Sequence, residues 1–145
     1  MKRLDYLKIA PDAVKALLTM EHYVNNSAIE KPLLNLIKLR ASQINGCAYC
    51  VNLHANEAKK DGESDRRINT LVVWKESPFF TDRERAALAW TEAVTLVATS
   101  GVHENLYKET LNYFSEKELV DLSMAIVTIN SWNRMAVSFS REPKE

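Results

Sequence analysis

The two cysteines of the chain, Cys47 and Cys50, stand three positions apart, and His54 follows Cys50 by four. Spacings of three and four residues place side chains on one face of an α-helix. Two thiols in that arrangement lie near enough to form a disulfide, and a neighbouring imidazole can accept a thiol proton. The pattern therefore indicates dithiol–disulfide redox chemistry.

The segment around the cysteines has the features of a helix start. Gly46 comes directly before Cys47, and a good helical run follows. At a helix N-terminus, free amides and the helix dipole stabilise a thiolate, which favours Cys47 as the reactive thiol. His54 lies one turn after Cys50 and favours that cysteine instead. Because a specific proton acceptor outweighs a partly screened terminal field, we predict Cys50 as the nucleophile and Cys47 as the resolving thiol.

Two other interpretations use the same residues. Cys47, Cys50 and His54 supply three potential zinc ligands, and His22, His103 or a water would complete a tetrahedral set. The three ligands would come from less than three turns of one helix, and the sequence has no second cysteine or histidine cluster, so no metal site is predicted. The cysteines could instead be two small buried apolar side chains, but the adjacent glycine and histidine favour the redox interpretation.

The composition excludes several other classes of protein. The chain has 145 residues, 46% of them hydrophobic and 26% charged, as in a globular domain. Nineteen basic residues balance nineteen acidic ones, so no bulk positive field exists to hold nucleic acid or an anionic membrane. Only three glycines occur, and their spacing makes neither a dinucleotide-binding loop nor a phosphate loop.

The sequence also predicts a soluble, cytoplasmic protein. Its longest stretch without Asp, Glu, Lys or Arg runs for 16 residues, from Ala41 to Asn56, and contains several polar side chains. Near the N-terminus, Lys2 and Arg3 are basic, but Asp5 and Lys8 interrupt any apolar signal core. Because the cytosol keeps ordinary thiols reduced, a cysteine pair there is seldom a structural disulfide.

Helix signals recur along the whole chain and predict one all-α domain over residues 1–145, a helical bundle with about six to seven helices. Proline or a capping residue opens most of these helices, and the glycines fall at helix ends. One expected helix begins at Pro11, one follows Ser64, and one follows Thr81, whose capping partner is Glu84. The others are expected from Pro32 to Ile44, from near Cys47 to before Gly62, from about Asn105 to Phe114, and from Ser115, whose capping partner is Glu118, to about Ser138.

One string of residues carries a family resemblance. Ser42-x-Ile44-Asn45-Gly46-Cys47-x-x-Cys50-x-x-x-His54 is far more restrictive than two cysteines alone, and residues 83–96 and 114–134 continue the similarity. The chain resembles the AhpD-like alkylhydroperoxidase branch of the carboxymuconolactone decarboxylase family. The resemblance implies an all-helical trimer or hexamer that reduces hydroperoxides without a cofactor, using a dithiol electron donor. Cys50 would attack the peroxide, Cys47 would close the disulfide and His54 would belong to the proton relay.

The chain departs from the family pattern at one position. A glutamate twelve residues before the first cysteine orients and charges the histidine in the family, and here that residue is Asn35. An amide can hydrogen-bond an imidazole but cannot stabilise its positive charge as a carboxylate does. Two alternatives follow: a general thiol–disulfide oxidoreductase that acts on disulfide substrates, or a catalytically weakened helical assembly protein. Asn35, Gln43 and Tyr49 are further candidates for relay or site-lining residues. Glu92 could approach the site in place of the absent glutamate, but a surface salt bridge is the favoured prediction for it.

Overall fold

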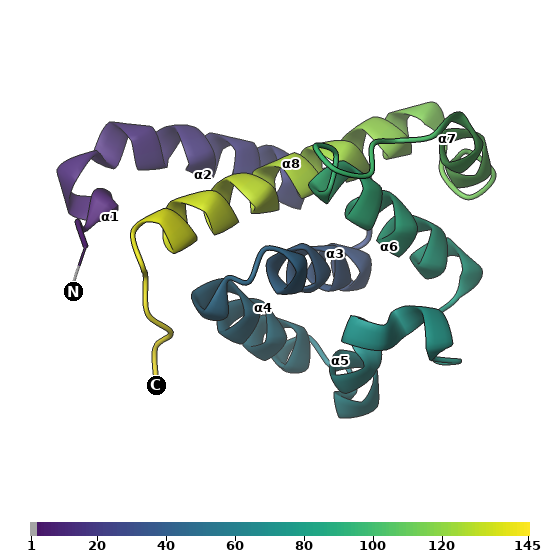
Figure 1. The fold of residues 1–145 in the computed structure, drawn as a ribbon, viewed down its shortest axis with the longest axis horizontal. Helices are drawn as coiled ribbons and strands as arrows, with labels where there is room; N and C mark the ends of the chain where they lie inside the picture. Colours follow the sequence, from purple (N-terminus) through teal and green to yellow (C-terminus); the bar gives the residue numbers. More distant parts are fainter. Residues whose placement is uncertain (1–2) are drawn as a thin grey trace.

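The computed structural model describes residues 3–145, so Met1 and Lys2 lie outside the described part. Eight α-helices, one 3₁₀ helix and no strand occur within that part, which confirms the all-α fold class. The helices cross around a central one, α3 (Figure 1). Their bounds are α1 Tyr6–Ile9, α2 Pro11–Asn25, α3 Lys31–Ile44, α4 Ala48–Lys60, α5 Asp65–Thr70, η1 Leu71–Glu76, α6 Asp82–Thr95, α7 Glu104–Thr110 and α8 Glu116–Ser138.

The helix count exceeds the expected six to seven because of two short pieces. α1 has four residues, and the Asp5 side chain caps it by accepting a hydrogen bond from the Leu7 amide. Pro11 then opens α2 as a separate helix. The 3₁₀ helix η1 continues directly from α5, with a kink at Val73, whose φ and ψ of −123° and 34° are not helical. Such short pieces lack the periodic pattern by which longer helices are recognised in a sequence.

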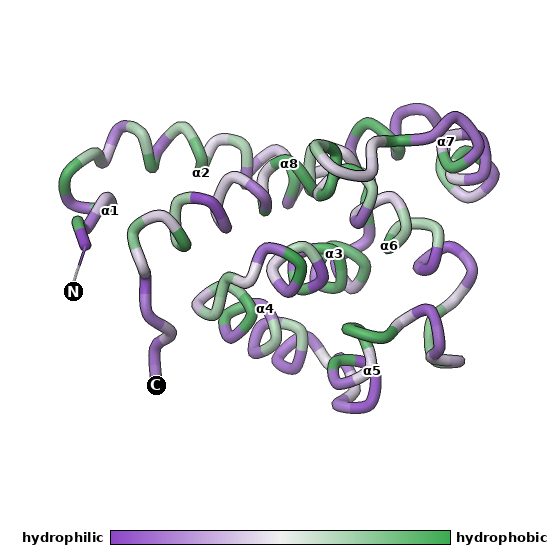
Figure 2. The backbone as a smooth tube through the Cα atoms, in the orientation of Figure 1, coloured by the Kyte–Doolittle hydropathy of each residue, from purple (hydrophilic) through white to green (hydrophobic). Residues whose placement is uncertain are grey.

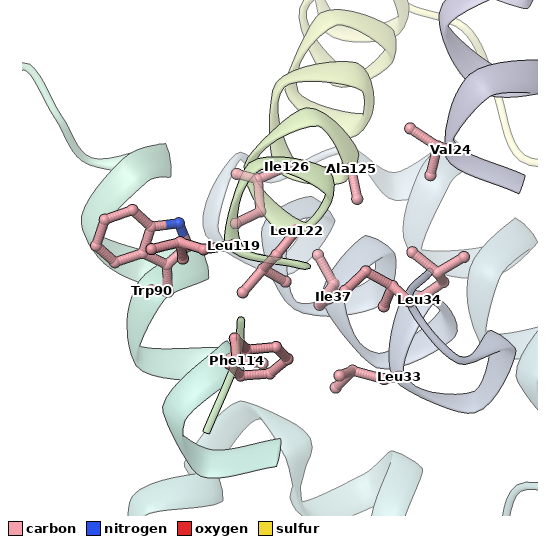
Figure 3. Packing of buried hydrophobic residues seen from close by; sticks show 12 residues of the cluster. Val24, Leu33, Leu34, Ile37, Trp90, Phe114, Leu119, Leu122, Ala125 and Ile126 are labelled. Atoms are coloured by element: carbon pink, nitrogen blue, oxygen red, sulfur yellow. The ribbon is translucent and has the colours of Figure 1, made fainter. Parts of the chain in front are cut away.

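The predicted helix from Asn105 to Phe114 is too long. α7 ends at Thr110, and the chain closes a turn there, with the amides of Tyr113 and Phe114 both donating to the Thr110 carbonyl. Phe114 is only 2% exposed and lies among residues of α3 and α8 (Figure 3). The turn therefore redirects an aromatic side chain into the core, and local propensity gives way to burial.

The core is built around α3, which is buried on nearly every side. Leu33, Leu34 and Ile37 of α3 pack in one cluster with residues of α8, and Trp90 of α6 belongs to the same cluster (Figure 3). A second cluster joins the other face of α3 to α4, η1 and α6. Each fully buried Leu or Ile contributes about 1.5–3 kcal/mol. Three polar residues, Asn35, Lys38 and Ser42, are nevertheless buried on α3, and the first two line the candidate site.

The outer helices have the amphipathic character of a water-exposed bundle. Hydrophobic and hydrophilic positions alternate around their coils, and the tail after α8 is hydrophilic (Figure 2). Within residues 3–145, no helix combines the length and the apolar character that crossing a membrane requires.

α3 and α4 share a single joint. Gly46, at φ +66°, follows the α3 cap residue Asn45, and this left-handed conformation suits glycine. The Gly46 amide donates to the Gln43 carbonyl and the Cys47 amide to the Ser42 carbonyl, which together form a Schellman motif. Cys47 is at the same time the N-cap of α4. Cys47 thus closes the Schellman motif that ends α3 and begins α4.

Side-chain amides hold this joint against α8. Asn45 Nδ2 donates to Asn130 Oδ1 at 3.0 Å and to Asn133 Oδ1 at 2.9 Å. Asn133 is fully buried, and its own Nδ2 donates to Ser42 Oγ at 3.0 Å. We call Ser42, Asn45, Asn130 and Asn133 the amide clamp. Because each of these buried or half-buried groups has a partner, the clamp fixes where the α3–α4 joint lies on α8.

Replacing Asn133 is expected to lower the free energy of unfolding. In Asn133→Ala, the Ser42 hydroxyl and the Asn45 amide each lose a buried partner, at a cost of about 1–3 kcal/mol. Urea unfolding followed by circular dichroism at neutral pH measures the loss. The matched control is Asn105→Ala on exposed α7, expected to change the value by less than about 0.5 kcal/mol. Equal unfolding free energies for the two variants would contradict a structural role for the clamp.

Candidate active site

The cysteine pair lies at the first turn of α4. Cys47 and Cys50 are joined by a disulfide, with Cα atoms 5.2 Å apart, and each residue is 2% exposed. The Cys50 amide donates to Cys47 Sγ at 3.2 Å, so the first sulfur caps the helix. Ala136 of α8 packs against both cysteines. The prediction that a helix start brings the two sulfurs within bonding reach is confirmed.

A cavity of about 850 Å³ opens beside this turn. Cys50 and His54 both line it, whereas Cys47 does not. Residues of α1, α2, α3, α4, α8 and the tail after α8 form the walls of the cavity. A small molecule in the cavity would therefore meet the Cys50 side of the disulfide and the imidazole together, a concave arrangement typical of binding sites.

His54 has a carboxylate partner on its own helix. Its Nδ1 lies 2.9 Å from Glu57 Oε2, three residues further along α4. An ionised carboxylate only accepts hydrogen bonds, so Nδ1 carries the proton in this pair. In the neutral ring, Nε2 is then the nitrogen with a free lone pair, suited to take a proton from a thiol. The ring is largely buried, with 11% of the side chain exposed.

The charge on Glu57 is stabilised by its surroundings. The hydrogen bond from His54 holds the pKa of Glu57 below its ordinary value of 4.5, and the positive charge of Lys38 acts in the same direction. Partial burial opposes this shift without cancelling it. Glu57 is consequently a carboxylate at neutral pH and can stabilise a positive charge on the imidazole.

Asn35 lines the same cavity, but its side-chain amide donates to Asp61. Its Nδ2 donates to Asp61 Oδ2 at 2.9 Å, and Lys31 reaches Asp61 Oδ1 at 3.2 Å. Hydrogen bonds from Asn35 and Lys31 lower the pKa of Asp61. The amide therefore ties α3 to the residue that ends α4.

The other expected residues are divided between the cavity and its surroundings. Tyr49 lines the cavity. Gln43 is not among the lining residues, and its Oε1 accepts from Arg40 at 3.2 Å. Glu92 forms the expected salt bridge, to Arg40 at 2.9 Å, but only 19% of its side chain is exposed. It also accepts from the indole of Trp74, so it belongs to the packing of α3 against α6 and η1.

Sequence reasoning missed several residues of the cavity. Glu57 had a visible signal, since it follows His54 by three on a helix face. Lys38 is only 8% exposed and donates to Glu21 Oε1 at 2.6 Å, which joins α3 to α2. Trp132 donates to the other oxygen of Glu21 from α8 at 3.2 Å. These contacts join residues far apart in the chain, which no local spacing reveals.

The zinc alternative finds no site in the described residues. Among residues 3–145, no three side chains of His, Cys, Asp or Glu are grouped so as to hold a metal ion. The two sulfurs that would have been ligands are bonded to each other.

The chain matches a known family by sequence. A model described as the carboxymuconolactone decarboxylase family matches residues 11–93, a range that contains the cysteine pair and His54. The chain is also similar to the uncharacterized protein YdfG of Bacillus subtilis (strain 168). The two are 39% identical over 137 residues, which cover 94% of this chain and 93% of YdfG.

Solved structures share the fold. A protein of unknown function from Agrobacterium tumefaciens, ATU0492, described as a candidate antioxidant defence protein AhpD, superimposes with a TM-score of 0.97 at 43% identity, covering 100% of this chain and 99% of that one. An uncharacterized peroxidase-related protein from Ralstonia eutropha JMP134, described as an alkylhydroperoxidase AhpD core, gives a TM-score of 0.84 at 20% identity, covering 96% and 74%. The latter likeness concerns the fold alone. These matches confirm the AhpD-like fold.

We predict that removing the imidazole raises the pKa of Glu57. In His54→Ala the hydrogen bond that lowers this pKa is lost while partial burial remains, so the carboxyl titrates at higher pH. Side-chain ¹³C NMR titration measures the change. Because the folded pKa is depressed, the wild-type pair stabilises the fold above pH 4.5, and this contribution is lost as the pH falls through the lower folded value.

The exposed His22, which does not line the cavity, provides the control. His22→Ala should leave the Glu57 titration unchanged. If Glu57 titrates identically in wild type and His54→Ala, the carboxylate–imidazole pair does not exist in solution.

Proposed function

The chain belongs to the carboxymuconolactone decarboxylase family, and from this membership and the site geometry we propose that it is a thiol-dependent oxidoreductase that reduces hydroperoxides. The observation that carries the proposal is that Cys50 and His54 line one cavity, while Cys47, which does not line it, is bonded to Cys50 in a disulfide. The substrate would be a hydroperoxide, and the electron donor a dithiol. The disulfide is the oxidised form of the pair.

The proposed cycle balances in three steps. The Cys50 thiolate attacks the terminal peroxide oxygen, the O–O bond breaks, and Cys50 becomes a sulfenic acid while the alkoxide takes a proton to leave as an alcohol. The Cys47 thiol then attacks the Cys50 sulfur, forming the disulfide and releasing water. A dithiol donor finally reduces the disulfide by exchange and becomes a disulfide itself.

His54 and Glu57 supply proton transfer in this scheme. Nε2 takes the proton of the Cys50 thiol, and the imidazolium then gives a proton to the departing alkoxide. Glu57 stays ionised and stabilises the charged ring through Nδ1. A positioned carboxylate of this kind orients the base and favours its protonated form in the transition state.

Glu57 also bears on the weakened-enzyme alternative. That alternative rested on Asn35, which leaves His54 without the family's carboxylate. Since Glu57 hydrogen-bonds the ring at 2.9 Å, the imidazole keeps a negatively charged partner. The general thiol–disulfide oxidoreductase remains the second candidate function, because the last step of the cycle is already an exchange with an external dithiol. By family resemblance, we also propose a homo-oligomer, a trimer or hexamer.

The peroxide reaction makes a direct prediction about mass. Reduced protein treated with limiting hydrogen peroxide should lose two hydrogen atoms by intact mass spectrometry, and both thiols should then resist alkylation. Cys47→Ser should stop at one added oxygen on Cys50, which dimedone traps, while Cys50→Ser should react far more slowly. Separate sulfinic acids on the two cysteines without a disulfide would exclude the cycle. Oxidation by a small disulfide but not by peroxide would favour the exchange function instead.

Replacing Glu57 should slow the peroxide step. In Glu57→Gln the ring loses a charge-assisted partner, so the rate constant for peroxide consumption is expected to fall about ten- to a hundredfold. The pH–rate profile should also shift, and Glu57→Asp should recover part of the rate. Glu109→Gln, on exposed α7, is the matched control. A Glu57→Gln enzyme with the wild-type rate and pH profile would show that Glu57 does not assist the histidine.

A further inference from the structure

We propose that Arg141 binds the carboxylate of an organic substrate in the cavity beside Cys50. This inference rests on the proposed function and names its substrate class: a hydroperoxide with an apolar body and an acid group. Arg141 lies in the tail after α8 and lines the same cavity as Cys50 and His54. Three features of the cavity support the assignment: its charge, the way the guanidinium is held, and its apolar walls.

The cavity has an excess of positive charge. Four of its lining residues are lysine or arginine, and three are aspartate or glutamate. Each of the three acids already has a partner, whereas within residues 3–145 neither Lys60 nor Arg141 forms a salt bridge. An anion entering the cavity would therefore meet cations that no carboxylate of the described chain neutralises. The pairs are Lys38–Glu21 at 2.6 Å, His54–Glu57 at 2.9 Å and Lys31–Asp61 at 3.2 Å.

The Arg141 guanidinium is held in place by contacts that leave most of its N–H donors available. Its central carbon lies 3.9 Å from the centroid of the Tyr49 ring, and Nη1 donates to the Tyr6 hydroxyl at 3.3 Å. Arg67 and Arg83, in contrast, each contact two glutamates. A half-buried guanidinium that stacks on an aromatic ring keeps most of its donors for a ligand, and its planar fork matches a carboxylate.

The remaining walls suit an apolar body of moderate size. Tyr49 lies between the two cysteines in the sequence, so the guanidinium stacked on it lies close to the turn that bears the disulfide. A molecule whose acid group contacts Arg141 would place its body against apolar side chains near Cys50. A volume of about 850 Å³ leaves room for a substituted benzene ring. The apolar lining residues are Ile29, Leu34, Leu53, Trp132 and Ala136.

Calorimetry with a matched pair of unreactive ligands tests the proposal. Oxidised wild-type protein is titrated with 4-isopropylbenzoate and with 4-isopropylbenzamide, which has the same shape without the charge. The benzoate should bind about tenfold or more tightly than the amide. In Arg141→Gln this difference should disappear, and in Arg141→Lys, which keeps the charge without the fork, an intermediate difference should remain.

Arg66→Gln is the matched control, because Arg66 also stacks on an aromatic ring, Phe79, at 5.2 Å and lies outside the cavity. It should retain the full preference for benzoate. Circular dichroism before titration establishes that each variant is folded. Equal binding of benzoate and benzamide to wild type, no binding of either, or an unchanged preference in Arg141→Gln would overturn the proposal.

The two proposals fail separately. Benzoate binding is measured on the disulfide form without peroxide, so a protein that does not reduce peroxide can still pass this test. Conversely, disulfide formation by hydrogen peroxide needs no carboxylate, so its success or failure does not depend on benzoate binding. A second experiment compares the rates at which the reduced protein consumes two hydroperoxides at low concentration. Cumene hydroperoxide with a para-carboxylate should react about tenfold faster than its methyl ester, and Arg141→Gln should remove that difference.

Discussion

The whole site depends on the joint at Asn45, Gly46 and Cys47. Since Cys47 both closes the Schellman motif of α3 and caps α4, the direction of α4 is set by the end of α3 with no free linker between them. The amide clamp then fixes the joint on α8. The position of the disulfide relative to the cavity is a consequence of these backbone and amide contacts.

The same constraint explains why a buried helix carries polar residues. α3 is the centre of the core, yet Asn35, Lys38 and Ser42 are buried on it. Ser42 belongs to the clamp, while Asn35 and Lys38 face the cavity and find their partners in Asp61 and Glu21. Each buried polar group is satisfied, so the core tolerates a polar side that an unpaired group would make costly. The cavity occupies the place where that side meets α2, α4 and α8.

Local signals predicted most of the fold and part of the site. Capping boxes at Thr81 and Ser115 mark the starts of α6 and α8, and the spacing of the cysteines fixes their common face, because all these contacts lie within one or two turns. The four-residue α1 is too short to show a helical period. The early end of α7 and the place of Arg141 depend on tertiary contacts, which a single sequence does not encode in any fixed spacing. Glu57 is the exception, since its i+3 spacing from His54 was visible.

Glu57 places a carboxylate partner of His54 on the same helix, and Asn35 stands on α3 where the family resemblance places a glutamate. A glutamate on α3 would reach His54 only while α3 and α4 keep their packing, whereas a residue three positions away on α4 is held near the ring by the helix itself. The position on α3 is thereby free for an amide that donates to Asp61, which a second carboxylate could not do without like-charge repulsion. His54 thus has its charged partner on its own helix, while Asn35 ties the end of α4 to the core.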